Sequence, residues 1–382
     1  MSERKLVLVS LSNGTRVALL CMAFLFWLIA AETPVVRAQE EPTTENPPTP
    51  TAQGQAADVT AESVQVRRVK VNFFINSIHA IDDQSGSYAV DFWLDLFWRE
   101  PTLEGKSVAE VDPALLWNPQ IQAINSKDLT VLYQSYADSF EPDTNVYLSQ
   151  RLVGVFSSPF DLSRFPFDRQ QLAIQLESSE FDSNRLLFDF LGSDQAVIYS
   201  ESPFAFPLPL GKYVSTEFAL REWLLTTAQV VQQIHVLPYD KSSWAQFRIE
   251  LQIERQARPY VLKIMLVFIL IMVLGATVFA INARELRYRL LSLFLLLLTA
   301  ITFDFTRLQV SPRTAYITLL DIQALLCYLL LSLAIGAVVL IAWQNKGGST
   351  PLARLLNIGA TIGYIGLVIL LNLALGWYGN GG

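Results

Sequence analysis

The sequence is poor in the residues that most often build disulfides and metal centres. It contains two cysteines and two histidines in 382 residues. Cys21 and Cys327 lie in separate hydrophobic segments, and neither His79 nor His235 has a cysteine nearby. We therefore expect no intramolecular disulfide, no zinc site and no other metal centre.

Charge is also scarce, and phosphate-binding motifs are missing. Charged residues make up 16% of the chain, against about 25% in ordinary soluble domains. The formal net charge is −7 and there is no basic stripe, which excludes the usual nucleic-acid-binding classes. Neither histidine belongs to a triad pattern, and no glycine-rich loop joins a strand to a helix. We expect no enzyme activity and no cofactor.

Hydrophobic residues, in contrast, make up 52% of the chain and are unevenly distributed. Residues 1–38 carry basic residues, then an apolar run, and end in Val36-Arg37-Ala38, which predicts a cleaved signal peptide. An uncleaved membrane anchor is the alternative. Residues 39–63 are rich in Pro, Thr, Gln and Glu, so we expect a disordered linker.

From residue 64 to 258 the apolar residues recur with period two. In the stretch VKVNFFI, residues 69–75, the apolar Val69, Val71, Phe73 and Ile75 share one face. Similar strand-like runs follow, separated by turns rich in Asp, Pro, Gly and Ser. The pattern predicts a single all-β sandwich of the immunoglobulin-like kind.

After Arg258 the sequence changes to long apolar runs, which predict an all-α domain of four transmembrane helices. We place these spans at about 259–281, 290–309, 315–343 and 355–377 within a pore domain covering 259–382. The short links carry Arg284, Arg287 and Arg289, then Lys346 and Arg354, and such links face the cytoplasm. We therefore expect a multi-pass protein of the plasma (inner) membrane, in contact with lipid, with the β domain on the outer, periplasmic side.

Several motifs occur in an order and spacing typical of one receptor family. They are FPFD at Phe165–Asp168, with Ser158 and Leu172 where relatives carry two cysteines; Trp117-Asn118-Pro119; Trp93 and Trp98; Arg255 and Tyr260; and the linker Pro312–Tyr316. In these features the chain resembles the pentameric ligand-gated ion channels, the Cys-loop receptors. It resembles most the bacterial branch, which lacks the loop disulfide. The resemblance implies a homopentamer that is opened by an unknown small-molecule ligand or by protons and passes small monovalent inorganic ions.

The resemblance also implies roles for individual residues. The ligand-binding candidates are Trp93, Phe181, His235, Tyr239 and Trp244, although simple packing explains each almost equally well. Ile124 stands where many relatives have a tyrosine, so the aromatic set is incomplete. The residues implied in coupling the β domain to the helices are Asp82, Phe165, Pro166, Phe167, Asp168, Arg255, Pro312 and Tyr316. Among them, Arg255 is the expected partner of the Asp168 charge.

The second span is expected to line the pore. Leu291, Leu295, Leu298, Thr302 and Phe305 follow helical spacing and form one stripe, whose leucines would close a pore by dewetting. At the inner mouth Glu285 favours cations, whereas Arg287 and Arg289 favour anions, and the sequence leaves both open. The leucine-rich stripe also keeps a second interpretation open, a non-conducting membrane receptor or assembly of the same fold.

Overall fold

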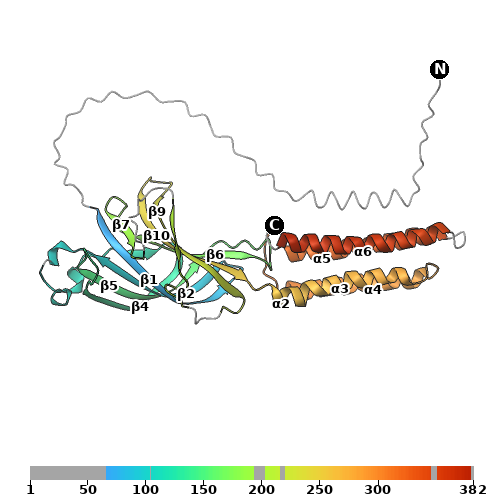
Figure 1. The fold of residues 1–382 in the computed structure, drawn as a ribbon, viewed down its shortest axis with the longest axis horizontal. Coiled ribbons are helices and arrows are strands. Elements are labelled where there is room, and N and C mark those ends of the chain that lie inside the picture. The colour runs from blue at the N-terminus through green and yellow to red at the C-terminus, as the bar shows by residue number, and fades with distance from the viewer. Residues whose placement is uncertain (1–65, 104, 193–202, 216–219, 346–350, 380–382) are drawn as a thin grey trace, which may run out of the picture. The chain divides into compact units, whose positions relative to one another are not determined.

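A computed structural model describes residues 66–103, 105–192, 203–215, 220–345 and 351–379. The predicted signal peptide and linker lie outside the described residues. Two five-stranded sheets and four long helices make up the described part of the chain (Figure 1).

The first sheet has the strand order β4-β5-β2-β1-β7. Its strands are β1 (Arg67–Asp82), β2 (Ser87–Trp98), β4 (Ser126–Asp138), β5 (Val146–Ser157) and β7 (Leu186–Phe190). Neighbouring strands are antiparallel except β1 and β7, which run parallel. Short 3₁₀ turns at Pro101–Leu103, Val108–Glu110 and Pro113–Leu115 lie between β2 and β3.

The second sheet has the order β3-β6-β10-β9-β8 and is antiparallel throughout. It contains β3 (Ile121–Ala123), β6 (Arg169–Ser178), β8 (Phe204–Leu208), β9 (Trp223–Val236) and β10 (Ser243–Arg255). The two sheets share one apolar core, which includes Val69, Val71, Phe73 and Ile75 from β1, as the alternation predicts. The sandwich prediction is confirmed.

The helical part begins at Arg258, three residues after β10 ends at Arg255. The first span combines α2 (Arg258–Tyr260), a π turn at Val261–Met265, α3 (Leu266–Thr277) and a 3₁₀ turn at Val278–Ala280. The others are α4 (Leu286–Leu308), α5 (Leu319–Gln344) and α6 (Pro351–Gly379). All four spans are long and apolar enough to cross a membrane.

Some helix ends differ from the sequence-based boundaries, for local reasons. The helix α4 starts four residues before the expected position, because charged residues in its first turn lower the hydropathy without preventing a helix. The helix α5 starts only at Leu319, because Thr318 caps it: the backbone N–H of Asp321 donates to Thr318 Oγ1, and Asp321 Oδ2 accepts from the Thr318 N–H. Pro351 opens α6, at a position where proline suits a helix.

Candidate functional site

The FPFD loop connects β5 to β6 and reaches the helical domain. Its residues Leu162 and Phe165 are buried in the same apolar cluster as side chains from α3 to α6. The ring of Phe165 meets that of Tyr260 edge to face, with 4.9 Å between centroids. Phe165 precedes Pro166 through a cis peptide bond. The loop is thus part of the helical core rather than a solvent-facing turn.

Arg255, the last residue of β10, lies at the centre of a charged cluster. Its Nε is 2.7 Å from Asp168 Oδ1 and its Nη2 is 2.9 Å from Asp83 Oδ2, while Nη1 lies 3.7 Å from Glu222 Oε2. The guanidinium also stacks over the rings of Phe165 and Trp223, at 4.8 and 4.1 Å. We call Arg255, Asp83, Asp168 and the two rings the Arg255 cluster.

The protonation of the Arg255 cluster follows from its burial. Burial disfavours the charge of Arg255, but the hydrogen bonds and charges of Asp168 and Asp83 outweigh it and raise its pKa. Burial raises the pKa of the Asp83 carboxyl, while its bond to Arg255 acts in the opposite direction. One arginine therefore holds three segments together: the end of β10, the FPFD loop and the turn between β1 and β2.

Asp83, and not Asp82, reaches Arg255 from the β1–β2 turn. Asp82 Oδ2 accepts a hydrogen bond from Ser85 Oγ at 2.7 Å and its Oδ1 accepts one from Gln84 N at 3.0 Å. These local bonds lower the pKa of Asp82. The sequence-based choice of Asp82 identified the turn that reaches Arg255, and the structure adds Asp83 as the carboxylate of this turn that binds the guanidinium.

The α4–α5 linker contacts the FPFD loop through hydrogen bonds. Leu162 N donates to the hydroxyl of Tyr316 at 2.8 Å, and Leu319 N donates to Ser163 O at 3.0 Å. Pro312 lies partly buried in the same linker. At the end of α6, a Cβ built on Gly379 would come within 2.7 Å of the Phe167 ring, so only glycine fits there without displacement. The loop thus contacts the first span, the linker and the last span.

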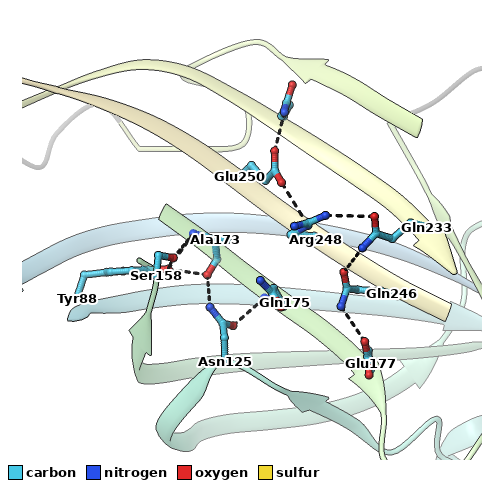
Figure 2. Close-up of polar contacts among 11 residues, drawn as sticks. Tyr88, Asn125, Ser158, Ala173, Gln175, Glu177, Gln233, Gln246, Arg248 and Glu250 are labelled. Carbon is cyan, nitrogen blue, oxygen red and sulfur yellow. Dashed lines mark hydrogen bonds and ion pairs between the residues drawn. The ribbon is translucent and has the colours of Figure 1, made fainter. Parts of the chain in front are cut away.

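A hydrogen-bonded cluster closes the loop where relatives have a disulfide (Figure 2). The Tyr88 hydroxyl donates to Ala173 O at 2.6 Å, accepts from Ala173 N at 2.8 Å, and lies 2.9 Å from Ser158 Oγ. Asn125 Nδ2 donates hydrogen bonds to Ser157 O and Ala173 O. We call Tyr88, Asn125, Ser158 and Ala173 the Tyr88 cluster. The sequence does not predict this cluster, because Tyr88 and Asn125 are distant from the loop in the sequence.

Of the five ligand-binding candidates, three lie on the β9–β10 hairpin. His235 and Trp244 are opposite each other in its ladder, and Tyr239 at its tip is 80% exposed. Trp244 Nε1 donates to Ser242 Oγ at 3.0 Å. His235 Nδ1 lies 2.7 Å from Glu177 Oε1 on β6.

The other two candidates lie elsewhere. Phe181 packs against Trp117, with 5.3 Å between centroids. Trp93 is on β2 in the other sheet, where its described ring partner is Tyr133, at 5.6 Å. A single chain therefore does not bring the five aromatic and imidazole side chains into one pocket.

A row of polar side chains crosses the outer face of β6, β10 and β9 (Figure 2). Gln246 Nε2 donates to Glu177 Oε1 at 2.8 Å, and Gln233 Nε2 donates to Gln246 Oε1 at 2.7 Å. Arg248 continues the row, with Nη2 3.2 Å from Gln233 Oε1 and Nε 3.2 Å from Glu250 Oε1. Since His235 also contacts Glu177, this row ties the base of the hairpin to β6.

Comparison with known proteins agrees with this arrangement. The family model for the neurotransmitter-gated ion-channel ligand binding domain matches residues 57–257. The chain belongs to the Cys-loop family of ligand-gated ion channels.

Relatives of this Cys-loop family member include the glycine receptor beta subunits of Rattus norvegicus, Mus musculus and Homo sapiens. Each is 27% identical over 277 residues, which cover 68% of this chain and 52% of the relative. The chain thus spans about half the length of the curated relatives it matches.

The helix α4 presents the expected stripe on its exposed side. Leu291, Leu295, Leu298, Thr302 and Phe305 are all exposed in the single chain. Leu298 is 60% exposed, whereas Leu293 and Ala300 on the opposite side of the helix are buried against α3 and α5. The described part of the chain therefore leaves the stripe uncovered.

Asp304 faces a neighbouring helix and not the stripe. Arg307 Nε lies 2.7 Å from Asp304 Oδ1, and Arg307 Nη2 lies 2.7 Å from Asp321 Oδ1 on α5. Asp321 also caps α5 through Thr318. This Arg307 cluster, formed by Asp304, Arg307 and Asp321, joins the outer end of α4 to the first turn of α5.

At the inner end of α4, the three residues predicted to set ion selectivity differ in exposure. Arg289 is 1% exposed and donates to Phe279 O, Ile281 O and Asn357 Oδ1 inside its own bundle. It lies in the first turn of a helix that starts earlier than expected, on the side away from the stripe. Glu285 and Arg287 are both exposed at this end.

Proposed function

We propose that this chain forms a homopentameric channel that passes small monovalent ions and is opened by a small-molecule ligand or by protons at the β domain. The Arg255 cluster is the observation that carries the proposal. The buried guanidinium at the end of β10, three residues before the first span, binds two carboxylates from separate loops of the sandwich. Displacement of either loop would disturb a charge that has no access to solvent.

The proposed gating path runs from the FPFD loop to α4. Movement of the loop acts on the linker through Tyr316 and Leu319, and on α4 through the Arg307 cluster. The exposed stripe of α4 lines the pore. Five copies of Leu298, with Leu295 and Leu291 further inward, form a hydrophobic constriction that closes by dewetting.

The proposed ligand site lies between subunits. Each copy contributes the β9–β10 hairpin with His235, Tyr239 and Trp244, and the next copy contributes the outer face of β2 with Trp93. The edge strand β4 exposes the apolar side chains of Val131 and Leu132, which supports the proposal that a neighbouring subunit covers this strand. The contact of His235 Nδ1 with Glu177 Oε1 at 2.7 Å fixes the base of this hairpin to β6.

The proposed location is a bacterial plasma (inner) membrane, with the sandwich on the periplasmic side. Of the three residues predicted to set ion selectivity, Arg289 is buried, whereas Glu285 and Arg287 are exposed and carry charges of opposite sign. The sign of the permeant ion is then decided by which of these two faces the pore.

Current recorded from the full protein in planar bilayers or oocytes tests the proposal. We would step the bath from neutral to acidic, add glycine as a first small-molecule probe, and read the reversal potential in asymmetric salt. We expect an evoked current whose reversal potential changes sign or size in Glu285→Gln or Arg287→Gln.

A second candidate, a non-conducting receptor of the same fold, is favoured by the leucine-rich stripe. Leu298→Ser separates the two. In a channel, the serine ring would let water into the constriction, so Leu298→Ser should conduct without a stimulus. Leu370→Ser, on the exposed side of α6, is the control and should not alter conduction. Silence of Leu298→Ser in a protein that assembles as a pentamer would favour the receptor.

A further inference from the structure

The inner end of the helical domain contains a cavity of about 640 Å³ between the Val278–Ala280 turn, the link that follows it, the start of α4 and α6. Three arginines line it, Arg284, Arg289 and Arg354, and none of its described lining residues carries a carboxylate. Arg284 and Arg354 are exposed. No residue of the Arg255 cluster, the hairpin or the stripe is among the described residues that line this cavity.

Arg289 forms the floor of the cavity and is a buried cation with neutral partners. Its Nε donates to Ile281 O at 3.0 Å, Nη1 to Asn357 Oδ1 at 2.9 Å, and Nη2 to Phe279 O at 3.0 Å. Among the described residues no carboxylate pairs with it. Carbonyl groups at the end of the first span offset part of the charge, since they carry the negative end of the helix dipole. A full negative charge in the cavity would compensate the rest.

Other residues that line the cavity indicate which kind of anion it could bind. The side-chain oxygen of Asn345 is buried without a hydrogen-bond partner, so it can accept from a hydroxyl group. Leu355 and Ile358 line the same cavity and are exposed on α6, where an acyl chain can cover them. Basic pockets between helices at this membrane surface suit lipid phosphates.

We propose that this cavity binds the phosphate headgroup of an anionic phospholipid of the phosphatidylglycerol type, from the leaflet at the inner ends of the helices. Arg284 and Arg354 contact the phosphate, Arg289 supplies the positive floor, and Asn345 accepts from the glycerol hydroxyl. The lipid would hold α6 against the end of the first span.

Native mass spectrometry of the full protein, titrated with phosphatidylglycerol or phosphatidylcholine, tests this site. We expect tighter binding of the anionic lipid to the wild type. In Arg284→Gln/Arg354→Gln the preference should weaken roughly thirtyfold, since each basic residue near a membrane surface contributes about 1 kcal/mol. Arg289 is left intact because its loss would disturb folding.

Arg287→Gln is the matched control, because Arg287 is exposed at the same end of α4 but does not line the cavity. It should leave phosphatidylglycerol binding within about twofold. Equal losses in the control and the double variant, or no preference for the anionic lipid in the wild type, would overturn the site. Displacement of the lipid by inorganic phosphate alone would identify a small-anion site instead. The readout needs no ion current, so it stands or fails separately from the channel proposal.

Discussion

The guanidinium of Arg255 and the carboxylate of Asp168 form a buried two-point contact, with Nε–Oδ1 and Nη2–Oδ2 distances of 2.7 and 3.2 Å. Both side chains are almost completely shielded from solvent. Loss of Arg255 leaves the Asp168 carboxylate buried without its cation, which in proteins costs about 3–5 kcal/mol, whereas loss of Asp168 leaves Arg255 with Asp83 as its close partner. This relationship makes the junction between sandwich and helices sensitive to single substitutions.

We expect Asp168→Asn to lower the free energy of unfolding by about 3 kcal/mol and to abolish evoked current. Arg255→Lys keeps the charge but loses the two-point geometry, so it should impair gating with a smaller loss of stability. Thermal unfolding and current measured on the same preparation check both expectations. Normal activation in Arg255→Ala, in a pentamer that assembles, would contradict the coupling role.

Acid should affect Asp83 and Asp82 in opposite directions. Burial raises the pKa of Asp83 above its ordinary 3.8, so the folded state takes up this proton before the unfolded chain does. The contribution of Asp83 to the stability of the fold is fully present at a pH below its ordinary pKa. It is lost as the pH rises through the raised pKa of the folded state. The stability of the wild type relative to Asp83→Asn should therefore rise on acidification.

Asp82→Asn is the control, because hydrogen bonds from Ser85 and Gln84 lower the pKa of Asp82. Relative to this variant, the wild type should lose stability as the pH falls through the lowered value. Melting temperatures of the three proteins across an acidic series measure both trends. Identical trends for the two variants would show that the raised pKa of Asp83 does not affect folding.

The Tyr88 cluster should carry part of the stability that a disulfide supplies in relatives. Tyr88→Phe leaves the backbone N–H and C=O of Ala173 with fewer partners in a buried place, so we expect a loss of about 1–3 kcal/mol. Tyr133→Phe removes the hydroxyl of a half-exposed ring and should stay within about 0.5 kcal/mol. Equal unfolding midpoints for the two variants would exclude a stabilising role for the cluster.

The Arg307 cluster should couple α4 to α5. Arg307→Gln leaves Asp304 and Asp321 without their shared cation, and we expect a loss of at least about 2 kcal/mol together with a shifted activation curve. A cycle that combines Arg307→Gln with Asp304→Asn should give a coupling of about 0.5–3 kcal/mol. The control is Arg313→Gln, at an exposed position of the linker. It should change the free energy of unfolding by almost nothing, and its effect should add to that of Asp304→Asn without coupling.

The sequence predicts the main elements of the fold because their signals are local. Alternation in the β1 and β2 segments and long apolar runs after Arg258 depend only on neighbouring residues. The short β3 and the edge strand β8 were missed: β3 has three residues, and β8 contains Pro207, which removes a ladder donor. The parallel pairing of β1 with β7 joins segments about a hundred residues apart, which periodicity does not report.

The site was predictable only in part. The FPFD motif and Arg255 suggested the ion pair that the structure contains, but the selection of Asp83 over Asp82 depends on how a tight turn directs two adjacent carboxylates. Trp223 over Arg255 and the Tyr88 cluster involve residues from distant strands with no motif of their own. The burial of Arg289 is not predictable from the sequence, because hydropathy alone puts the start of α4 one turn too late.

The Tyr88 cluster has a consequence for how the protein matures. Its donors and acceptors replace a covalent bond, and the sole cysteine in the described part of the chain, Cys327, is buried among helices. Formation of the loop therefore needs no oxidant, disulfide isomerase or oxidising compartment. The folded sandwich should tolerate strong reductants that would open the corresponding loop of a cysteine-containing receptor.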